Sequence, residues 1–138
     1  MVEMELNKIV IDEKRHDQLI VLKEKAGNRI LPIVIGLHEA SAIKLKISGF
    51  VPPRPLTHDL LHTMIENLEA NIEKVIIDKL EENTFHAKLV IKTRSGETKV
   101  IDARPSDSIA LAVRAHAPIF VEDDIIKQSE VFNKKPIE

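Results

Sequence analysis

The stretch at residues 17–47 reads DQLIVLKEKAGNRILPIVIGLHEASAIKLKI and contains the pattern that decides the fold. Residues 17–23 and 29–35 are rich in branched aliphatic side chains, which favours two β-strands. Residues 25–28 lie between them and include Gly and Asn, which are typical of turns. The composition then changes to good helix formers, so we expect a helix at 38–47. The stretch therefore predicts a β-hairpin followed by a helix.

The same order of elements returns later in the chain. Residues 85–93 and 98–103 have the composition of strands, and Gly96 supplies a turn between them. A helix capped by Ser106 or Asp107 is expected to follow. The sequence thus predicts an α+β fold with a mostly antiparallel sheet, built from two β-hairpin-plus-helix units with additional helices packed on it.

The remaining segments complete this order. Residues 50–55 contain three prolines and should be extended rather than helical. Thr57 is the expected N-cap of a helix that runs to Leu68, and its spacing predicts a buried face of five apolar side chains. These side chains are Leu60, Leu61, Met64, Ile65 and Leu68. Further strands are expected at 6–11, 72–80 and 118–121, and a last helix is expected from Asp123 or Asp124 to residue 130.

The length and composition fit one globular domain. The chain has 138 residues, of which 43% are hydrophobic and 30% are charged. Four Phe and no Trp or Tyr are present, so the core must be mostly aliphatic. The absence of Cys excludes disulfides, thiolate metal sites and a Cys nucleophile. We expect the domain to span residues 1–132, with a flexible tail at 133–138.

The charge pattern limits the choice of partners and location. The formal net charge is −2, and this lack of a basic excess argues against a broad nucleic-acid-binding surface. The acidic start of the chain does not resemble a signal peptide, and no apolar run approaches the ~20 residues that span a bilayer. We therefore expect a cytoplasmic protein without a membrane segment.

Two polar segments each lead into an expected helix. PRPLTHDLL at 53–61 and DARPSDSIA at 102–110 both contain an Arg-Pro step, at Arg54 and Arg104. A guanidinium group beside the N-terminus of a helix suits a phosphate. From the spacing alone a structural interpretation is preferred, in which both arginines pair with Asp59, Asp102 or Asp107 and so fix the loops.

These segments carry a resemblance to a known family. PRPLTHDLL at 53–61, DARPSDSIALAVR at 102–114 and LPIVIGLHEASAI at 31–43 resemble the signature segments of the bifunctional nuclease domain family. The similarity covers about residues 5–132, with the three segments in family order. It implies the fold of that family and a nuclease activity on RNA and DNA, as described for plant members.

The residues of these segments could support metal-assisted hydrolysis of phosphodiester bonds. The reaction needs an activated water and stabilisation of charge on the phosphoryl oxygens. Mg²⁺ or another divalent cation could be held by carboxylates, for which the candidates are Glu39, Asp59, Asp102 and Asp107. Arg54 and Arg104, with Thr57 and Ser106, are the candidates for binding the substrate. His58 is the candidate general acid or base. The catalytic set expected from the sequence is Arg54, His58, Asp59, Asp102, Arg104 and Asp107.

Two further hypotheses remain open beside the nuclease. The same segments could form a non-catalytic binding module for a phosphorylated ligand or a partner protein. Alternatively, they could build the interface of an oligomeric scaffold, since a small α+β domain with exposed sheet edges commonly pairs with itself. We expect a homo-oligomer, with a dimer favoured.

Overall fold

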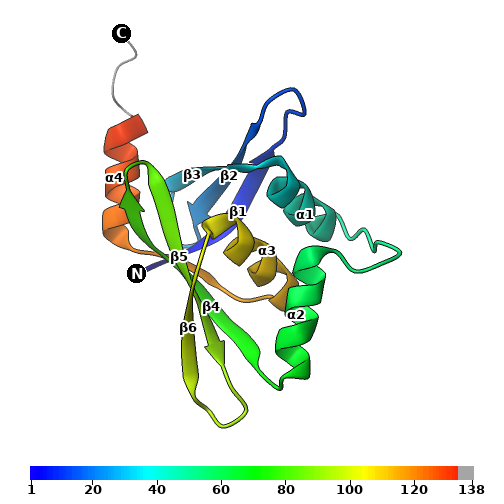
Figure 1. Ribbon diagram of the computed structural model, residues 1–138. Coiled ribbons are helices and arrows are strands. Elements are labelled where there is room, and N and C mark those ends of the chain that lie inside the picture. The colour runs from blue at the N-terminus through cyan, green and yellow to red at the C-terminus, as the bar shows by residue number, and fades with distance from the viewer. Residues whose placement is uncertain (134–138) are drawn as a thin grey trace.

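A computed structural model describes the backbone of residues 1–133 and the side chains of residues 1–130 (Figure 1). This part of the chain forms seven strands and four helices, all of them expected from the sequence to within a few residues. The elements in chain order are β1 (Val2–Val10), β2 (Asp17–Glu24), β3 (Ile30–Gly36), α1 (Leu37–Ile47), α2 (Thr57–Asn67), β4 (Asn71–Glu81), β5 (Thr84–Lys92), β6 (Thr98–Ala103), α3 (Pro105–Ala115), β7 (Ile119–Val121) and α4 (Asp123–Asn133).

The strands form one sheet in the order β3-β2-β1-β7-β4-β5-β6. All neighbours are antiparallel except β7 and β4, which are parallel. The predicted α+β fold with a mostly antiparallel sheet is therefore confirmed. Each repeated unit is larger than a hairpin, because β1–β3 precede α1 and β4–β6 precede α3. The short strand β7 joins the two halves of the sheet.

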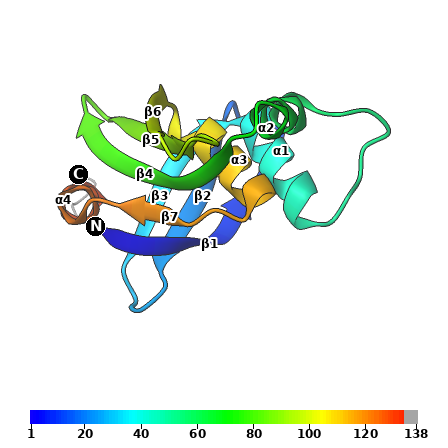
Figure 2. The same cartoon turned by 90° about the horizontal axis from the view of Figure 1, so that it is seen from below.

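Helix α3 lies against the inner side of the curled sheet (Figure 2). It contacts α1, α2, β4 and β5. Its buried residues include Ile109, Ala110 and Ala112, and the small alanine side chains allow close packing against these neighbours. Helices α1 and α2 lie at one end of the molecule and α4 lies at the other (Figure 2). This arrangement brings the N-terminal ends of α1, α2 and α3 into one region.

The helix caps differ from those expected. The N-cap of α2 is Leu56, whose backbone N–H donates to Asp59 Oδ2 at 2.9 Å, and Thr57 is the first residue of the helix. The N-cap of α3 is Arg104, not Ser106 or Asp107. Pro105 accounts for this shift, because a proline at the first helical position has the φ angle that the helix needs and lacks only an N–H that would be unbonded there.

The predicted buried face of α2 is wrong. Leu60, Met64 and Leu68 are 53%, 51% and 78% exposed, and Leu61 is exposed as well. Of the five apolar residues only Ile65 packs against the core. Helical spacing identifies an apolar stripe but does not say which side of the helix meets the body, and α2 instead turns His58 inward.

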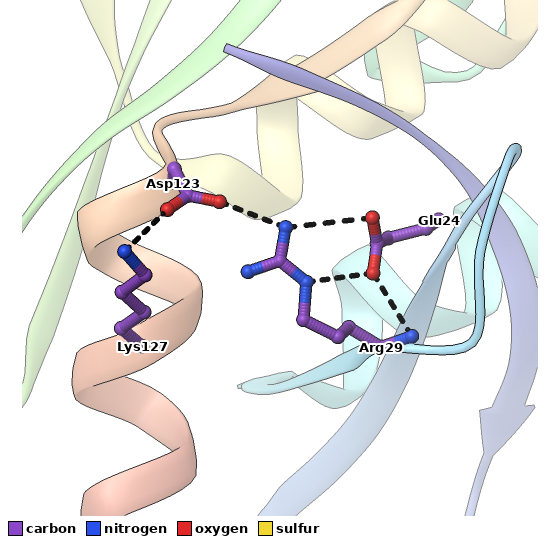
Figure 3. Close-up of polar contacts among 4 residues, drawn as sticks. All are labelled: Glu24, Arg29, Asp123 and Lys127. Atoms are coloured by element: carbon purple, nitrogen blue, oxygen red, sulfur yellow. Dashed lines mark hydrogen bonds and ion pairs between the residues drawn. The ribbon is translucent and has the colours of Figure 1, made fainter.

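Arg29 fixes the turn between β2 and β3 to the start of α4 (Figure 3). Its Nε donates to Glu24 Oε1 at 2.7 Å, and its Nη2 donates to Asp123 Oδ1 at 2.8 Å. Lys127 lies one helical turn after Asp123 and pairs with it at 3.0 Å. We call Glu24, Arg29, Asp123 and Lys127 the Arg29 network. It ties the first half of the sheet to the last helix.

Two further expectations concern the C-terminal tail and the lack of a membrane segment. Of the tail expected at 133–138, Asn133 belongs to α4 and residues 134–138 lie outside the described residues. None of the helices in the described part of the chain combines the length and the apolar character needed to cross a membrane.

Candidate functional site

Three helices place a carboxylate at their third residue, near the same region. These residues are Glu39 in α1, Asp59 in α2 and Asp107 in α3. A carboxylate in the first turn is favoured because the N-terminal end of a helix carries partial positive charge. Each residue comes from a different one of the three segments that resemble the family. The fold therefore gathers distant parts of the sequence at one place.

Arg104 binds two of these carboxylates, and one of the two also contacts a histidine. Its Nε donates to Asp107 Oδ2 at 2.9 Å, and its Nη2 donates to Glu39 Oε1 at 3.1 Å. The other oxygen of Asp107, Oδ1, lies 2.9 Å from His58 Nε2. We call Glu39, His58, Arg104 and Asp107 the Arg104 cluster. It links the starts of α1, α2 and α3.

The Arg104 cluster is partly open to solvent. The side chain of Arg104 is 66% exposed, whereas that of His58 is 10% exposed. The hydrogen bond to Asp107 raises the pKa of Arg104, so the guanidinium stays charged. Two carboxylates therefore face one guanidinium, and one of them also contacts the imidazole of His58. Because its side chain is mostly exposed, Arg104 can reach a ligand.

A buried ion pair lies beside the cluster. Arg114 Nε donates to Asp59 Oδ1 at 2.7 Å, and Arg114 Nη1 donates to the carbonyl of Ala110 at 2.8 Å. The Arg114 side chain is only 2% exposed. Burial raises the pKa of Asp59, but hydrogen bonds from the Leu56 N–H and from Arg114 outweigh it and hold that pKa below its ordinary value. The pair fixes α2 against α3 and thereby positions His58.

The sequence interpretation missed Arg114. The available signal was its spacing, since it follows Asp107 by seven residues, or about two helical turns, and so lies on the same face of α3. A helix otherwise made of small and apolar residues at those positions would bury such a charge, and a buried arginine needs a partner.

Two hollows adjoin these groups. The larger, of about 640 Å³, is lined by Arg104 and Ser106 and by apolar residues that include Val34 and Phe85. Ser106 is 5% exposed. The smaller, of about 370 Å³, is lined by Asp59, Arg114 and the proline-rich loop before α2. His58 and Asp107 line neither hollow.

Asp102 lies apart from the cluster. Its carboxylate pairs with Lys88 at 3.0 Å, and this contact lowers its pKa. The register of β5 and β6 places Lys88 opposite Asp102, while the neighbouring Ala87 is fully buried. Because side chains alternate between the two faces of a strand, Lys88 and Asp102 share the outer face of the sheet.

The two remaining candidates are on the surface. Arg54 is exposed on the loop between α1 and α2, and it forms no ion pair with any described residue. Thr57 is exposed at the start of α2, next to His58. The structure therefore brings Glu39, His58, Arg104 and Asp107 together, with Asp59 and Thr57 adjacent in the chain to His58.

The four expected ligands of a divalent cation are already paired with positive or imidazole groups. Glu39 and Asp107 bind Arg104, Asp59 binds Arg114, and Asp102 binds Lys88. Within residues 1–133, His, Cys, Asp and Glu side chains form no group of three or more that could hold a metal ion. These residues, as arranged, do not fit a cation, since the carboxylates would first have to release their present partners.

A polar cluster at the starts of three helices, on a curled sheet, defines a small α+β domain in which the three family-like segments meet. The chain belongs to the bifunctional nuclease domain family, whose model matches residues 20–134. This confirms the family that the three sequence segments indicate.

Relatives of the chain fall into two groups. An uncharacterized protein of Mycobacterium tuberculosis is 40% identical over 129 residues, which cover 94% of the chain and 76% of that protein. Bifunctional nuclease 2 of Oryza sativa subsp. japonica is 26% identical over 129 residues, covering 91% of the chain and 40% of that protein. Bifunctional nuclease 1 of Arabidopsis thaliana is 23% identical over 112 residues, covering 80% of the chain and 34% of that protein. The chain thus corresponds to less than half of either plant nuclease.

Proposed function

We propose that the chain is a nuclease that hydrolyses phosphodiester bonds of RNA, DNA or both at the Arg104 cluster. The observation that carries this proposal is the contact of His58 with Asp107 and of Arg104 with both Asp107 and Glu39, which joins the three family segments. The family and the names of the plant relatives support the reaction class.

The substrate phosphate binds at the exposed side of Arg104. The Arg104 side chain is 66% exposed and precedes the first N–H groups of α3, which favour an anion. The Ser106 hydroxyl is available as a further donor at the edge of the larger hollow. The apolar wall of that hollow, including Phe85, receives the nucleoside next to the bound phosphate. Thr57 and Arg54 stand on the α2 side and contact the continuing strand.

His58 exchanges the protons in this reaction. A water oxygen attacks phosphorus and forms a P–O bond, while the bond between phosphorus and the leaving oxygen breaks. His58 takes one proton from the attacking water and then gives that proton to the leaving oxygen, so the proton count balances. Asp107 accepts a hydrogen bond from Nε2, which leaves Nδ1 as the nitrogen that accepts the proton. Arg104 offsets the charge that develops on the phosphoryl oxygens.

That a divalent cation assists the reaction is a separate prediction. A metal ion would supply Lewis-acid assistance, but the paired carboxylates offer it no preformed site. The test is to measure cleavage after exhaustive chelation and again with added Mg²⁺. Cleavage that needs Mg²⁺ would show that the cation rearranges the cluster, and cleavage under chelation would show that the side chains suffice.

The proposal is tested with fluorescently labelled single-stranded RNA and DNA. We expect cleavage by the purified protein, and a loss of about 100-fold in Arg104→Gln because the phosphate loses its charged partner. Arg29→Gln is the matched control, since Arg29 also binds two carboxylates but lies in a different network. Equal rates in both variants would point to a contaminating enzyme and contradict the proposal.

A second candidate is a non-catalytic module that binds a phosphorylated ligand. The pairing of Glu39, Asp107 and Asp59 with positive groups favours it, because these carboxylates would have to release their partners before they could activate water or hold a metal ion. Titration calorimetry with a short 5′-phosphorylated oligonucleotide distinguishes the two. Saturable binding that needs Arg104, without any product in the same sample, would establish the module and exclude the nuclease.

A further inference from the structure

The turn between β4 and β5 departs from the sequence that its shape favours. The register pairs Glu81 with Thr84. Glu82 and Asn83 therefore form a two-residue turn, and their φ angles are positive, at 50° and 63°. Glycine adopts positive φ without strain and is the usual second residue of such a turn. The β5–β6 turn follows this preference with Gly96, at a φ of 86°, whereas the β4–β5 turn has Asn83.

Asn83 belongs to the wall of the larger hollow of the candidate site. It lines this hollow of about 640 Å³ together with Phe85 and Arg104, whereas Glu82 does not. Asn83 is exposed, so its side-chain amide is open to a ligand. An amide places a hydrogen-bond donor beside an acceptor. The turn does not require this pair, since glycine would fit the backbone better.

The strand register sets the distance between Asn83 and the proposed phosphate site. Ala87 pairs with Ala103, and Arg104 follows directly on Ala103. Asn83 lies four residues before Ala87, so the turn extends about 13 Å along the strand beyond this pair. Phe85 lies on the same stretch of β5. This spacing suits one nucleotide, with its phosphate at Arg104 and its base between Phe85 and Asn83.

We propose that Asn83 hydrogen-bonds the base next to the scissile phosphate and selects adenine. The inference rests on the proposed function, because it places the phosphate at Arg104. Adenine carries a donor beside an acceptor, N6 and N7, and an asparagine amide matches this pair with two hydrogen bonds. Guanine presents two acceptors at the same edge, N7 and O6, and gives the carbonyl oxygen of Asn83 no donor.

The remaining walls of the hollow favour a purine over a pyrimidine. A two-ring base covers more of the Phe85 ring, and stacking on an aromatic side chain strengthens with the area covered. The volume of about 640 Å³ lies within the range of about 300–1,000 Å³ that is typical of small-molecule sites. The hollow therefore has room for the larger bases, and Asn83 decides between them.

The choice of asparagine at this turn has a physical explanation in this role. A residue in a sparsely populated backbone conformation persists where its side chain has a function. Asn83→Gly removes the amide and also fits the positive φ, so its fold should be at least as stable as that of the wild type. A loss of selection in this variant is then separate from any loss of folding.

Titration calorimetry with adenosine and guanosine 5′-monophosphates tests the selection without any need for turnover. We expect the wild-type protein to bind the adenine nucleotide about tenfold more tightly, because a matched pair of hydrogen bonds discriminates by at least this factor. Asn83→Gly should bind both equally, with a midpoint of thermal unfolding no lower than that of the wild type. Glu82→Gly is the matched control, since Glu82 shares the turn and the positive φ but lies outside the hollow, and it should keep the tenfold preference.

A labelled pyrimidine oligonucleotide with one adenine, made as RNA and as DNA, gives the second readout. The wild type should cleave it beside the adenine, and Asn83→Gly should lose this preference. Absent binding of both nucleotides, or equal affinity for them, would overturn the proposal. So would a preference that survives Asn83→Gly or that Glu82→Gly removes. Cleavage without base preference would reject the role of Asn83 and leave the nuclease standing, whereas selective binding without cleavage would reject the nuclease alone.

Discussion

The Arg29 network and the Arg104 cluster are built alike but differ in one component. In each, an arginine lies between two carboxylates. Asp123 of the Arg29 network and both carboxylates of the Arg104 cluster belong to the first turn of a helix. The Arg29 network joins β2 to α4, whereas the Arg104 cluster joins α1, α2 and α3. The Arg29 network contains a second positive side chain, Lys127 (Figure 3). The Arg104 cluster contains His58 instead.

This difference decides what each group can do. Two positive and two negative charges balance in the Arg29 network at any pH near neutrality, and the hydrogen bonds from Arg29 lower the pKa values of Glu24 and Asp123. The Arg104 cluster has a histidine in the place of Lys127, and an imidazole can both donate and accept a proton. A closed network of charges suits a structural tie, whereas an imidazole beside an exposed guanidinium suits chemistry on a substrate. The variants below test whether this distinction is correct.

The largest effect on stability is expected from Asp59→Asn, in the ion pair that holds α2 against α3. The substitution leaves Arg114, with a 2% exposed side chain, without its charged partner. It should lower the free energy of unfolding by about 3 kcal/mol, measured by urea denaturation at pH 7. Arg114→Met added to Asp59→Asn should recover part of this loss, because no buried charge remains. A double variant as unstable as Asp59→Asn alone would show that the charge is not the cause.

The same pair predicts a dependence on acid. The pKa of Asp59 is lower in the folded chain than in the unfolded chain. Its contribution to stability is therefore fully present above the unfolded pKa, near 4, and is lost as the pH falls through the lower folded value. Denaturation curves at pH 7, 5 and 3 should converge for wild type and Asp59→Asn at the lowest pH. A constant gap between the two proteins would contradict this assignment.

Asp107→Asn breaks the Arg104 cluster without removing its shape. The amide cannot balance Arg104 or orient His58 with its negative charge, so cleavage of labelled RNA should fall by about 100-fold. Thermal unfolding should change little, since Asp107 is 31% exposed. Activity that persists in a folded Asp107→Asn protein would place the reaction elsewhere.

The order of elements could be predicted from the sequence because local signals agree with the fold. The aliphatic runs before and after residues 25–28, and again around Gly96, identify both hairpins, and Pro32 lies on the edge strand β3 where its missing N–H is tolerated. The exposed stripe at Leu60, Met64 and Leu68 could not be predicted, because periodicity marks an apolar face and is silent on which surface covers it.

The candidate site could be predicted only in part. The helix starts at His58 and Asp107 were visible, but their contact depends on how α2 packs on α3. Asp102 was grouped with them from sequence proximity, although the strand register turns it to the outer face beside Lys88. Arg114 was overlooked because a lone charge at the end of an apolar helix indicates burial only once the packing is known.

Arg29→Gln tests whether the Arg29 network serves stability alone. It removes the link between the β2–β3 turn and Asp123 at the start of α4. Because the pairs are solvated, we expect a small decrease in the midpoint of thermal unfolding, well below that of Asp59→Asn, and an unchanged rate of cleavage. A loss of cleavage without a loss of stability would contradict a purely structural role of the Arg29 network.

The smallest effect is expected from Gly36→Ala, which perturbs the Arg104 cluster indirectly. A Cβ atom at this position would meet the carboxylate of Glu39 and push it away from Arg104. Losing one solvated ion pair should reduce cleavage by about threefold. Gly27→Ala is the control, because its Cβ would meet Glu24 of the Arg29 network instead. Equal effects of both variants on cleavage would remove the distinction between the two groups.

The most direct test is the cleavage rate of His58→Gln beside that of Arg29→Gln, measured with labelled single-stranded RNA under identical conditions. We expect His58→Gln to retain no more than about 1% of the wild-type rate, while Arg29→Gln cleaves normally. Normal cleavage by His58→Gln would contradict it, because the histidine in contact with Asp107 would then have no part in the reaction.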